Sequence, residues 1–221
     1  MVNTKRCDYS THNLLRKGKK MDTRDKIKRN VLERALLHVP FDGWSQETLE
    51  RASIEAGGDS SYAWRLFPKG PLEAIAYWSH VLDQEMLSAL PSPENLRVRE
   101  KIALAVKIRL GLLIPYREAA RKTARYLALP HHVGQGSRLV YQTVNEIWYY
   151  AGDISTDYNF YTKRALLAWV YSATFLYWFR DHSEGFENTW VFLDRRIDEV
   201  LKLPKLPQKI AKCLFPWRRH E

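Results

Sequence analysis

Residues 148–196 read WYYAGDISTDYNFYTKRALLAWVYSATFLYWFRDHSEGFENTWVFLDRR, and this stretch decides the fold. It holds Trp, Tyr and Phe at a density far above the 13% of the whole chain. Within it, Ala165 to Phe179 is a run of fifteen residues without a charge, interrupted only by the polar Ser172 and Thr174. Such a run is too short to span a bilayer, which needs roughly 20 apolar residues. We therefore expect a central helix buried on all sides, whose aromatic neighbours either fill a core or wall a cavity for a large apolar ligand.

The rest of the chain divides into further helices at proline, glycine and capping residues. Ser45 is placed to cap one helix, Pro40 to end the helix before it, and Gly57-Gly58 to stop the capped one. We find no alternation of apolar and polar residues with the period of two that a half-buried strand requires. The sequence therefore predicts an all-α protein. The expected helices cover residues 23–39, 46–56, 60–66, 71–90, 97–114, 116–127, 137–151, 156–179 and 185–201.

The first three of these helices, with a tight turn between the second and the third, have the arrangement of a helix-turn-helix. Three short motifs support this assignment: Gly-Trp-Ser-x-x-Thr-Leu at 43–49, Ala-Gly-Gly at 56–58 and Phe-Pro-x-Gly at 67–70. Together they resemble the N-terminal domain of TetR-type repressors. We therefore expect a helix-turn-helix module at residues 22–70, followed by a helical body at residues 71–203.

Charge is distributed unevenly along the chain, whose net charge is +10. Residues 1–20 and residues 202–221 each carry a net charge of +5, and the residues between them are neutral. Basic tails suit an anionic membrane surface or nucleic acid equally well, but they do not place a DNA-binding face inside the folded domain. We interpret residues 1–21 as a weakly ordered basic extension, with a mitochondrial presequence as the alternative, and residues 204–221 as a separate basic segment.

The sequence offers no constellation for catalysis or for metal binding. It contains no nucleophile elbow, phosphate-binding loop, dinucleotide fingerprint or zincin motif, and its seven histidines are scattered. Its two cysteines, Cys7 and Cys213, lie in the tails without metal-ligand spacing and indicate reduced thiols. We expect a protein that is not an enzyme and that has no catalytic residue, no metal site and no cofactor.

Several motifs in a fixed order resemble one protein family. They are Arg109-Leu110 with Ile114-Pro115-Tyr116, Leu129-Pro130-His131, Tyr149-Tyr150-Ala151-Gly152-Asp153, Ser155-Thr156-Asp157, Tyr161-Thr162-Lys163-Arg164-Ala165 and Phe186-Glu187-Asn188-Thr189-Trp190. This pattern, over about residues 25–201, resembles the accessory family of ubiquinone (coenzyme Q) biosynthesis, the ninth protein of the Coq series. The resemblance implies an all-helical, TetR-like homodimer that binds a phospholipid or an isoprenoid quinone. It also implies a partner, the di-iron hydroxylase that acts on demethoxyubiquinone.

The expected ligand site is an elongated apolar cavity between the helices at 97–114, 137–151 and 156–179, because their apolar faces exceed what one seam of a small bundle needs. The residues expected to face the lipid are Leu110, Leu113, Trp148, Leu166, Val170 and Ala173. The resemblance adds Arg164 as the contact of a phospholipid headgroup. The local alternatives for Arg164 are an ion pair with Asp157 and a solvated side chain.

The resemblance also implies a docking surface for the hydroxylase around Gly152, formed by Ile147, Tyr150, Phe160 and Tyr161. Phe160 stands where the family usually has tryptophan, which keeps the surface apolar but removes an indole N–H. The alternative is that most of these four side chains belong to the core. We expect at least one of them to be buried.

Residues 205–219 have the composition of an amphipathic helix at a membrane surface. On a helical wheel, the apolar residues fall in one sector and the lysines in the adjacent one, as in an interfacial anchor. Packing on the body and disorder are the alternatives. The residues expected to bind the anionic membrane are Lys209, Ile210, Lys212, Leu214 and Trp217. The expected location is the cytoplasmic side of the inner membrane in a bacterium, or the matrix face of the mitochondrial inner membrane in a eukaryote.

Two other functions compete with a lipid-binding accessory protein. A TetR-type repressor with an apolar effector would bind DNA, but residues 46–66 carry a net charge of −2 and the helix at 60–65 offers one cation, Arg65. A phosphate backbone repels a negative surface, so we expect no specific binding of nucleic acid. The third possibility is an interaction scaffold without a ligand.

Overall fold

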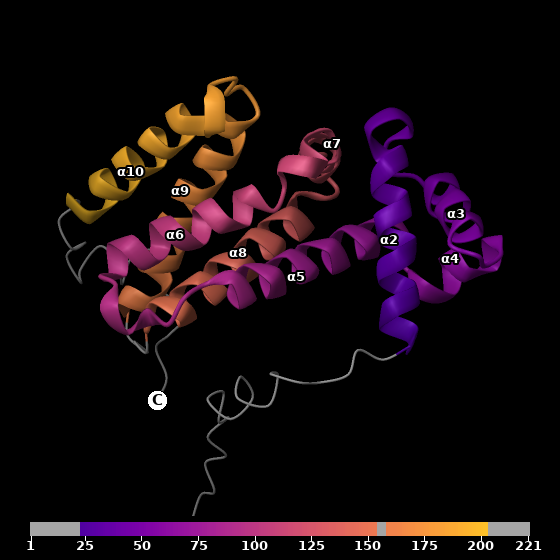
Figure 1. The fold of residues 1–221 in the computed structure, drawn as a ribbon, viewed down its shortest axis with the longest axis horizontal. Helices are drawn as coiled ribbons and strands as arrows, with labels where there is room; N and C mark the ends of the chain where they lie inside the picture. Colours follow the sequence, from indigo (N-terminus) through magenta and orange to yellow (C-terminus); the bar gives the residue numbers. More distant parts are fainter. Residues whose placement is uncertain (1–22, 154–157, 203–221) are drawn as a thin grey trace, which may run out of the picture.

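The computed structural model describes residues 23–153 and 158–202, and every regular element in them is helical (Figure 1). The α-helices are α2 (Thr23–Asp42), α3 (Gln46–Glu55), α4 (Ser60–Leu66), α5 (Pro71–Ala89), α6 (Val98–Gly111), α7 (Arg117–Leu127), α8 (Val133–Ala151), α9 (Tyr158–Trp178) and α10 (Glu187–Lys202). Three short 3-10 helices lie between them, η1 (Pro93–Asn95), η2 (Ile114–Tyr116) and η3 (Glu184–Phe186). The predicted all-α fold is confirmed.

Helices α2, α3 and α4 form a three-helix module at one end of the molecule (Figure 1). Ser45 caps α3 by accepting a hydrogen bond from the backbone N–H of Thr48, and Asp59 caps α4 through the N–H of Tyr62. Gly57, in the turn between α3 and α4, has a φ of +86°, which glycine adopts without a steric penalty. The capping residues and the glycine turn therefore produce the helix-turn-helix that the sequence predicts.

Helix α2 continues through Pro40 to Asp42, so the prediction that Pro40 ends this helix was wrong. A proline lacks the N–H that would bond to the carbonyl four residues earlier. The next turn still closes, because the N–H of Gly43 donates to the carbonyl of Val39 at 3.0 Å. One missing hydrogen bond near the end of a long helix is therefore tolerated.

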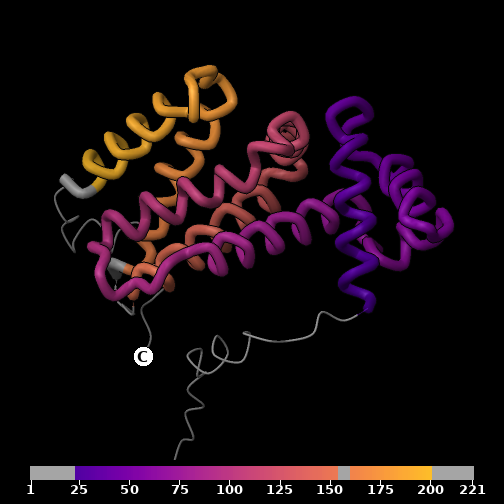
Figure 2. Tube along the Cα trace, viewed as in Figure 1, coloured from indigo at the N-terminus to yellow at the C-terminus, as the bar shows by residue number. Residues whose placement is uncertain are grey.

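Helix α5 leaves the module and runs along the body beside α6 and α8 (Figure 2). The module also packs against the body through α2 and α7. Trp44, in the loop after α2, is buried and donates its indole N–H to the hydroxyl of Thr123 on α7 at 2.7 Å. Helix α5 therefore connects the module to the body along the chain, and the buried hydrogen bond between Trp44 and Thr123 joins them at a second place.

Helix α9 is not buried on all sides, contrary to the expectation from its composition. Leu167 and Val170 face inward, whereas Trp169, Leu176 and Tyr177 are 49%, 60% and 38% exposed. Helices α8 and α10 pack against α9 and cover only part of its surface. Apolar composition predicts that a face needs a cover, but it does not say whether the same chain supplies one. Within residues 23–153 and 158–202, no helix combines the length and the hydropathy needed to cross a membrane.

Candidate functional site

The candidate site is built around the turn that ends α8. Gly152 takes the left-handed conformation, with a φ of +86°, and the N–H of Asp153 donates to the carbonyl of Trp148 at 3.0 Å. A glycine just after the last helical residue favours this helix cap, because it has no side chain to clash in the left-handed region. The turn places Asp153 next to the first turns of α9.

The carboxylate of Asp153 joins two cations of α9. It accepts hydrogen bonds from Nζ of Lys163 at 2.8 Å and from Nη1 of Arg164 at 3.3 Å, and its own side chain is 6% exposed. A buried carboxylate requires such partners, since its lost hydration must be replaced. One buried carboxylate therefore binds two cations of α9.

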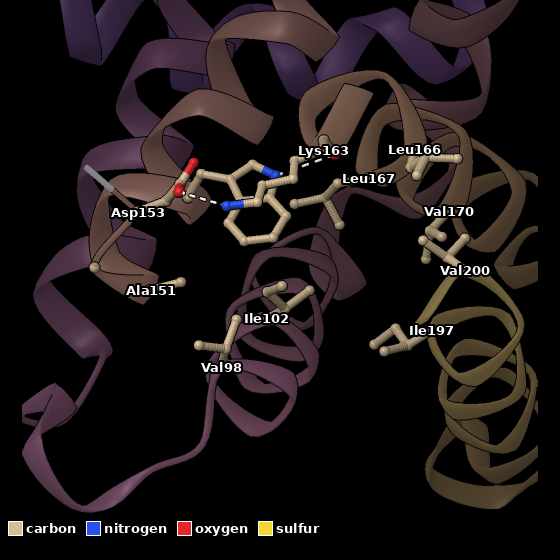
Figure 3. Close-up of a pocket in the computed structure, with 12 residues that line it drawn as sticks. Val98, Ile102, Ala151, Asp153, Lys163, Leu166, Leu167, Val170, Ile197 and Val200 are labelled. Atoms are coloured by element: carbon tan, nitrogen blue, oxygen red, sulfur yellow. Dashed lines mark hydrogen bonds and ion pairs between the residues drawn. The ribbon is translucent and has the colours of Figure 1, made fainter. Parts of the chain in front are cut away.

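Beside this cluster lies a cavity of about 490 Å³ (Figure 3). Asp153 and Lys163 lie on one side of it, and Ile197 and Val200 of α10 lie across from them (Figure 3). Trp148 also lines the cavity, and its indole N–H donates to the carbonyl of Lys163 at 3.2 Å. The aliphatic lining residues are Val98, Ile102, Ala151, Leu166, Leu167, Val170, Ile197 and Val200. Apolar walls with a few polar groups are usual for a small-molecule site.

Three of the seven residues predicted to face a lipid line this cavity, namely Trp148, Leu166 and Val170. Leu110 is fully buried in the core, and Leu113 lines a second, smaller cavity. Ala173 lies in a different groove, between α7 and the C-terminal half of α9. The sequence identifies the apolar helices correctly, but it does not give their rotation relative to one another, which decides the wall to which each residue belongs.

Arg164 lies behind the cavity wall. Its side chain is 1% exposed, and its guanidinium carbon lies 3.3 Å from the centre of the Phe160 ring. It forms an ion pair, as one of the local alternatives expected, but the partner is Asp153; Asp157 lies outside the described residues. A headgroup contact for Arg164 therefore stays a prediction. The cation in the cavity wall is Lys163.

Two parts of the cavity were not predicted from the sequence, namely its polar side and the wall that α10 forms. Lys163 belongs to the same motif as Arg164, but the motif does not tell which of the two cations faces inward. Helix α10 supplies the additional wall through Ile197 and Val200, which lie three residues apart and therefore on one face. Val98 and Ile102 of α6 have the equivalent spacing of four residues, and this periodicity was a usable signal.

The four residues expected at the docking surface separate into one buried and three surface side chains. Placing Ile147 there was wrong, because it is fully buried on the inner face of α8. Tyr161 is 49% exposed, and the half-buried Phe160 packs edge to face against it with ring centroids 5.1 Å apart. Tyr150 is half-buried, and its hydroxyl donates to the carbonyl of Pro91 at 3.0 Å. The expectation that at least one of the four is buried is confirmed.

The arrangement of groups in the site is suited to binding. In the part of the chain that the structure describes, no three His, Cys, Asp or Glu side chains are grouped so that they could hold a metal ion. The residues expected to bind a membrane, Lys209, Ile210, Lys212, Leu214 and Trp217, lie outside the described ranges. What the site presents is an ammonium group and a carboxylate at one side of an aliphatic wall.

The fold is shared with a solved structure. A TetR transcriptional regulator from Nitrosomonas europaea superimposes with a TM-score of 0.66, covering 81% of this chain and 100% of that chain at 20% sequence identity. At this identity the likeness concerns the fold alone, since one fold can serve unrelated functions. The predicted TetR-like arrangement is confirmed.

Sequence comparisons agree with the motifs of residues 109–190. The profile of the COQ9 family matches residues 133–204. "Ubiquinone biosynthesis protein COQ9, mitochondrial" of Rattus norvegicus is 35% identical over 82% of this chain and 61% of the relative. "Ubiquinone biosynthesis protein COQ9-B, mitochondrial" of Xenopus laevis is 30% identical over 86% of this chain and 68% of the relative. The chain spans 60–61% of the length of its mammalian relatives. From the motifs, the fold and these relatives together, the chain belongs to the COQ9 family.

Proposed function

We propose that this chain is a non-catalytic accessory protein of ubiquinone biosynthesis. It binds an isoprenoid quinone intermediate in the cavity of Figure 3 and presents it to a di-iron demethoxyubiquinone hydroxylase at the membrane. The observation that carries the proposal is the cavity itself, with its aliphatic walls and its single charged side. Its volume of about 490 Å³ falls in the range of about 300–1,000 Å³ found for small-molecule sites.

The polar side of the cavity suits a ligand that carries oxygen acceptors. The ammonium group of Lys163 lines the cavity, and such a group donates hydrogen bonds to a quinone carbonyl or to a phosphate oxygen. An isoprenoid or acyl chain would lie against the aliphatic walls, where each Å² of apolar surface removed from water contributes about 25 cal/mol. A quinone and a phospholipid share this chemistry, so an experiment must separate them.

The exposed aromatic residues near Gly152 support docking of the hydroxylase. Tyr161 is half exposed, and half-exposed tyrosines are favoured anchors of protein interfaces. Phe160 contacts Tyr161 on one side and the guanidinium of Arg164 on the other. Arg164 in turn binds Asp153, which lines the cavity. A continuous series of contacts therefore connects the proposed docking surface with the proposed ligand.

We also propose a homodimer through the outer face of α9 and α10. Four exposed apolar side chains gather on these two helices, namely Trp169, Leu176, Tyr177 and Val191. Apolar surface of this kind favours association, and a two-fold dimer covers the same patch on both copies.

Membrane contact through residues 204–221 remains part of the proposal. Helix α10, which precedes this segment, lines the cavity near its C-terminal end through Ile197 and Val200. Because α10 leads into the basic segment, attachment of that segment to an anionic surface would bring the cavity to the membrane. We propose a peripheral location, on the inner membrane of a bacterium or on the matrix face of the mitochondrial inner membrane.

The repressor function is disfavoured by the way in which the module uses its cations. Arg51 of α3 forms an ion pair with Asp42, and Arg65 of α4 lies 3.6 Å from Asp59 and over the ring of Tyr62. Phosphate recognition requires cations that are available to the nucleic acid. Both arginines lie beside carboxylates of the module, and residues 46–66 carry a net charge of −2, which a phosphate backbone repels.

Native mass spectrometry of the purified protein tests the proposed ligand. The wild type is expected to carry an isoprenoid quinone, and Leu166→Trp, which fills the cavity, is expected to lower its occupancy at least about tenfold, since a filled cavity has no room for the chain. Leu37→Trp, the same substitution at a 59% exposed position of the module, serves as the control and keeps the ligand. Retention of the lipid by Leu166→Trp would contradict the site. A phospholipid in place of the quinone would contradict the presentation of a quinone, and protein without any lipid would favour a scaffold.

A further inference from the structure

A groove of about 820 Å³ lies on the body between α7, the C-terminal half of α9 and α10. Among the described residues it shares no lining side chain with the cavity proposed to bind the quinone, so the two sites are separate. Four basic side chains line it, namely Arg121 and Arg125 of α7 and Arg180 and His182 of the segment that follows α9. None of its described lining residues is acidic, so this side of the groove is cationic.

The arginines of this groove are available to a ligand. Nη2 of Arg121 donates to the carbonyl of Phe179 at 2.8 Å, which fixes its guanidinium beside the groove. Nη1 of Arg121 lies 3.6 Å from the carboxylate of Glu118, whose side chain is 58% exposed. Within residues 23–153 and 158–202, Arg125 and Arg180 have neither a hydrogen-bond partner nor an ion-pair partner. The groove therefore has one positioned guanidinium and two that no protein carboxylate binds.

Positive charges gather in the groove without a counter-charge in its lining. Arg121 and Arg125 are four residues apart on α7, a spacing at which two like charges destabilise a helix. Elsewhere in the body, Arg109 of α6 donates from Nε to the carboxylate of Asp83 of α5 at 2.7 Å. An anion in the groove would supply the counter-charge that Asp83 supplies to Arg109, since guanidinium groups bind carboxylate and phosphate oxygens through charge-assisted hydrogen bonds.

The remaining lining of the groove is apolar and partly open to solvent. Leu176 is 60% exposed and Tyr177 is 38% exposed. The ring of Tyr177 stacks on that of Phe192 of α10, with centroids 4.4 Å apart and planes 6° from parallel. Rings stacked in this way favour a further flat group against them. The volume of about 820 Å³ lies within the range of about 300–1,000 Å³ for small-molecule sites, so a body of two rings fits.

We infer that this groove binds a small organic anion with a flat aromatic body, whose carboxylate or phosphate group is bound by Arg125 and Arg180. The aromatic body lies against Leu176 and Tyr177, and Arg121 adds positive charge beside the anion. The basic side chains are not among the four proposed for the homodimer, but Leu176 and Tyr177 are. The oligomeric state of the protein is therefore measured together with binding.

The test compares 1-naphthoate with 1-naphthamide, two probes of nearly equal shape that differ in charge. In ligand-detected NMR titrations of the full-length protein, the wild type is expected to bind 1-naphthoate at least about tenfold more tightly, the contribution of one hydrogen bond to a charged group. Arg125→Gln combined with Arg180→Gln is expected to abolish this preference and to leave the affinity for 1-naphthamide unchanged. Arg34→Gln combined with Arg138→Gln removes the same charge at exposed positions outside the groove and is the control that keeps the preference.

Two phosphate probes define the anion and the need for an aromatic body. Binding of 1-naphthyl phosphate that is tighter than that of 1-naphthoate would assign the site to phosphate esters, and weaker binding would assign it to carboxylates. Both results support an anion site. Inorganic phosphate is expected to bind at least about tenfold more weakly than 1-naphthyl phosphate, because it has no apolar surface to bury.

Two further variants locate the probes. Ala128→Trp fills the groove from an exposed position and is expected to abolish binding of 1-naphthoate and of 1-naphthamide. Leu166→Trp fills the cavity of Figure 3 and is expected to leave their binding unchanged. Melting temperatures near that of the wild type show that each variant is folded.

The inference is overturned if the wild type binds neither naphthyl probe or binds both equally, or if inorganic phosphate binds as tightly as 1-naphthyl phosphate. It is also overturned if the double variant of Arg125 and Arg180 keeps the preference for 1-naphthoate. Binding that disappears when sedimentation shows a dimer would mean that a second copy occupies the groove, which again contradicts the inference. Wild type that carries no quinone in mass spectrometry, but still prefers 1-naphthoate, would contradict the proposed function alone.

Discussion

The three-helix module and the body place their charged groups in opposite ways. In the module, Arg51 and Asp42 pair at the surface, with side chains 57% and 42% exposed. In the body, the pair of Arg109 and Asp83 is almost completely buried, and it borders a cavity. Water therefore solvates the charged pair of the module, whereas only protein groups solvate the charged pair of the body.

This difference indicates where the molecule keeps its specific chemistry. An exposed ion pair contributes about 0–1 kcal/mol and is replaced easily by water and salt. A buried charge persists only where its geometry is fixed, because losing one partner costs about 3–5 kcal/mol. In the module, Arg51 and Arg65 pair at the surface with Asp42 and Asp59. The buried clusters around Asp83 and Asp153 lie in the body, beside the two cavities.

The largest effect is expected from breaking the buried pair of the body. Asp83→Asn leaves Arg109 without its counter-charge in the interior, so the free energy of unfolding is expected to fall by about 3–5 kcal/mol. Urea denaturation at neutral pH measures this change. A loss below about 1 kcal/mol would place this buried pair in the same energetic class as the surface pairs and would remove the contrast between the two regions.

A large change in binding, without a change in stability, is expected at the exposed aromatic residues of the body. Tyr161→Asp is expected to weaken capture of the hydroxylase by at least about tenfold, as for an interface anchor worth about 2 kcal/mol. The melting temperature is expected to stay near that of the wild type, because Tyr161 is 49% exposed. Tyr141→Asp, at a similarly exposed tyrosine, is the control for a charge placed on the surface. Unchanged capture by Tyr161→Asp would mean that the partner binds elsewhere.

A smaller, pH-dependent effect is expected at Asp181, which caps the start of α10. Its carboxylate accepts hydrogen bonds from the backbone and the hydroxyl of Ser183 and of Thr189, at 2.6–2.9 Å. Burial opposes the charged form, but these hydrogen bonds outweigh it and hold the pKa of Asp181 well below its ordinary value. Replacing such a cap is expected to cost about 1–2 kcal/mol.

The sign of the pH dependence follows from the lowered pKa. The contribution of Asp181 is complete above the ordinary carboxyl pKa of about 3.9 and declines as the pH falls below it, since the unfolded state takes up the proton first. Denaturation of the wild type and of Asp181→Asn at pH 7 and at pH 3 measures the difference between them. A difference that is constant over this range would mean that the charge of Asp181 does not contribute.

The smallest effect is expected in the module. Arg51→Ala removes one exposed ion pair, and the free energy of unfolding is expected to change by less than about 1 kcal/mol. The change is expected to shrink further in 1 M salt, where exposed charges are screened within about 3 Å. A loss comparable with that of Asp83→Asn would show that the surface pairs of the module are structural after all.

The fold was predictable because local residues specify it. Ser45 and Gly57 define the ends of the module's second helix, and the motifs from Arg109 to Trp190 identify the family. The predicted end of the first helix at Pro40 was wrong, because a proline near the end of a helix weakens it without terminating it.

The site was only partly predictable because it depends on how the helices are rotated. Periodicity shows that Ile147, Leu110 and Ala173 lie on apolar faces, but each face meets a different neighbour. An ion pair of Arg164 with Asp157, two turns away along the chain, was one of the local alternatives to a headgroup contact, and Asp157 lies outside the described residues. The turn at Gly152 brings Asp153 to Arg164, and such a contact arises only when two helices are placed in space.

The bond between Trp44 and Thr123 has a thermodynamic consequence. Trp44 also lies 6.5 Å from Trp78 of α5, centroid to centroid, and both Trp78 and Thr123 line the second cavity. The module cannot melt without exposing this junction to water, so module and body are expected to unfold as one cooperative unit. Calorimetry of the lipid-free protein would then give a single heat-absorption peak whose calorimetric and van't Hoff enthalpies agree. On this view the three-helix module supports the interior of the body.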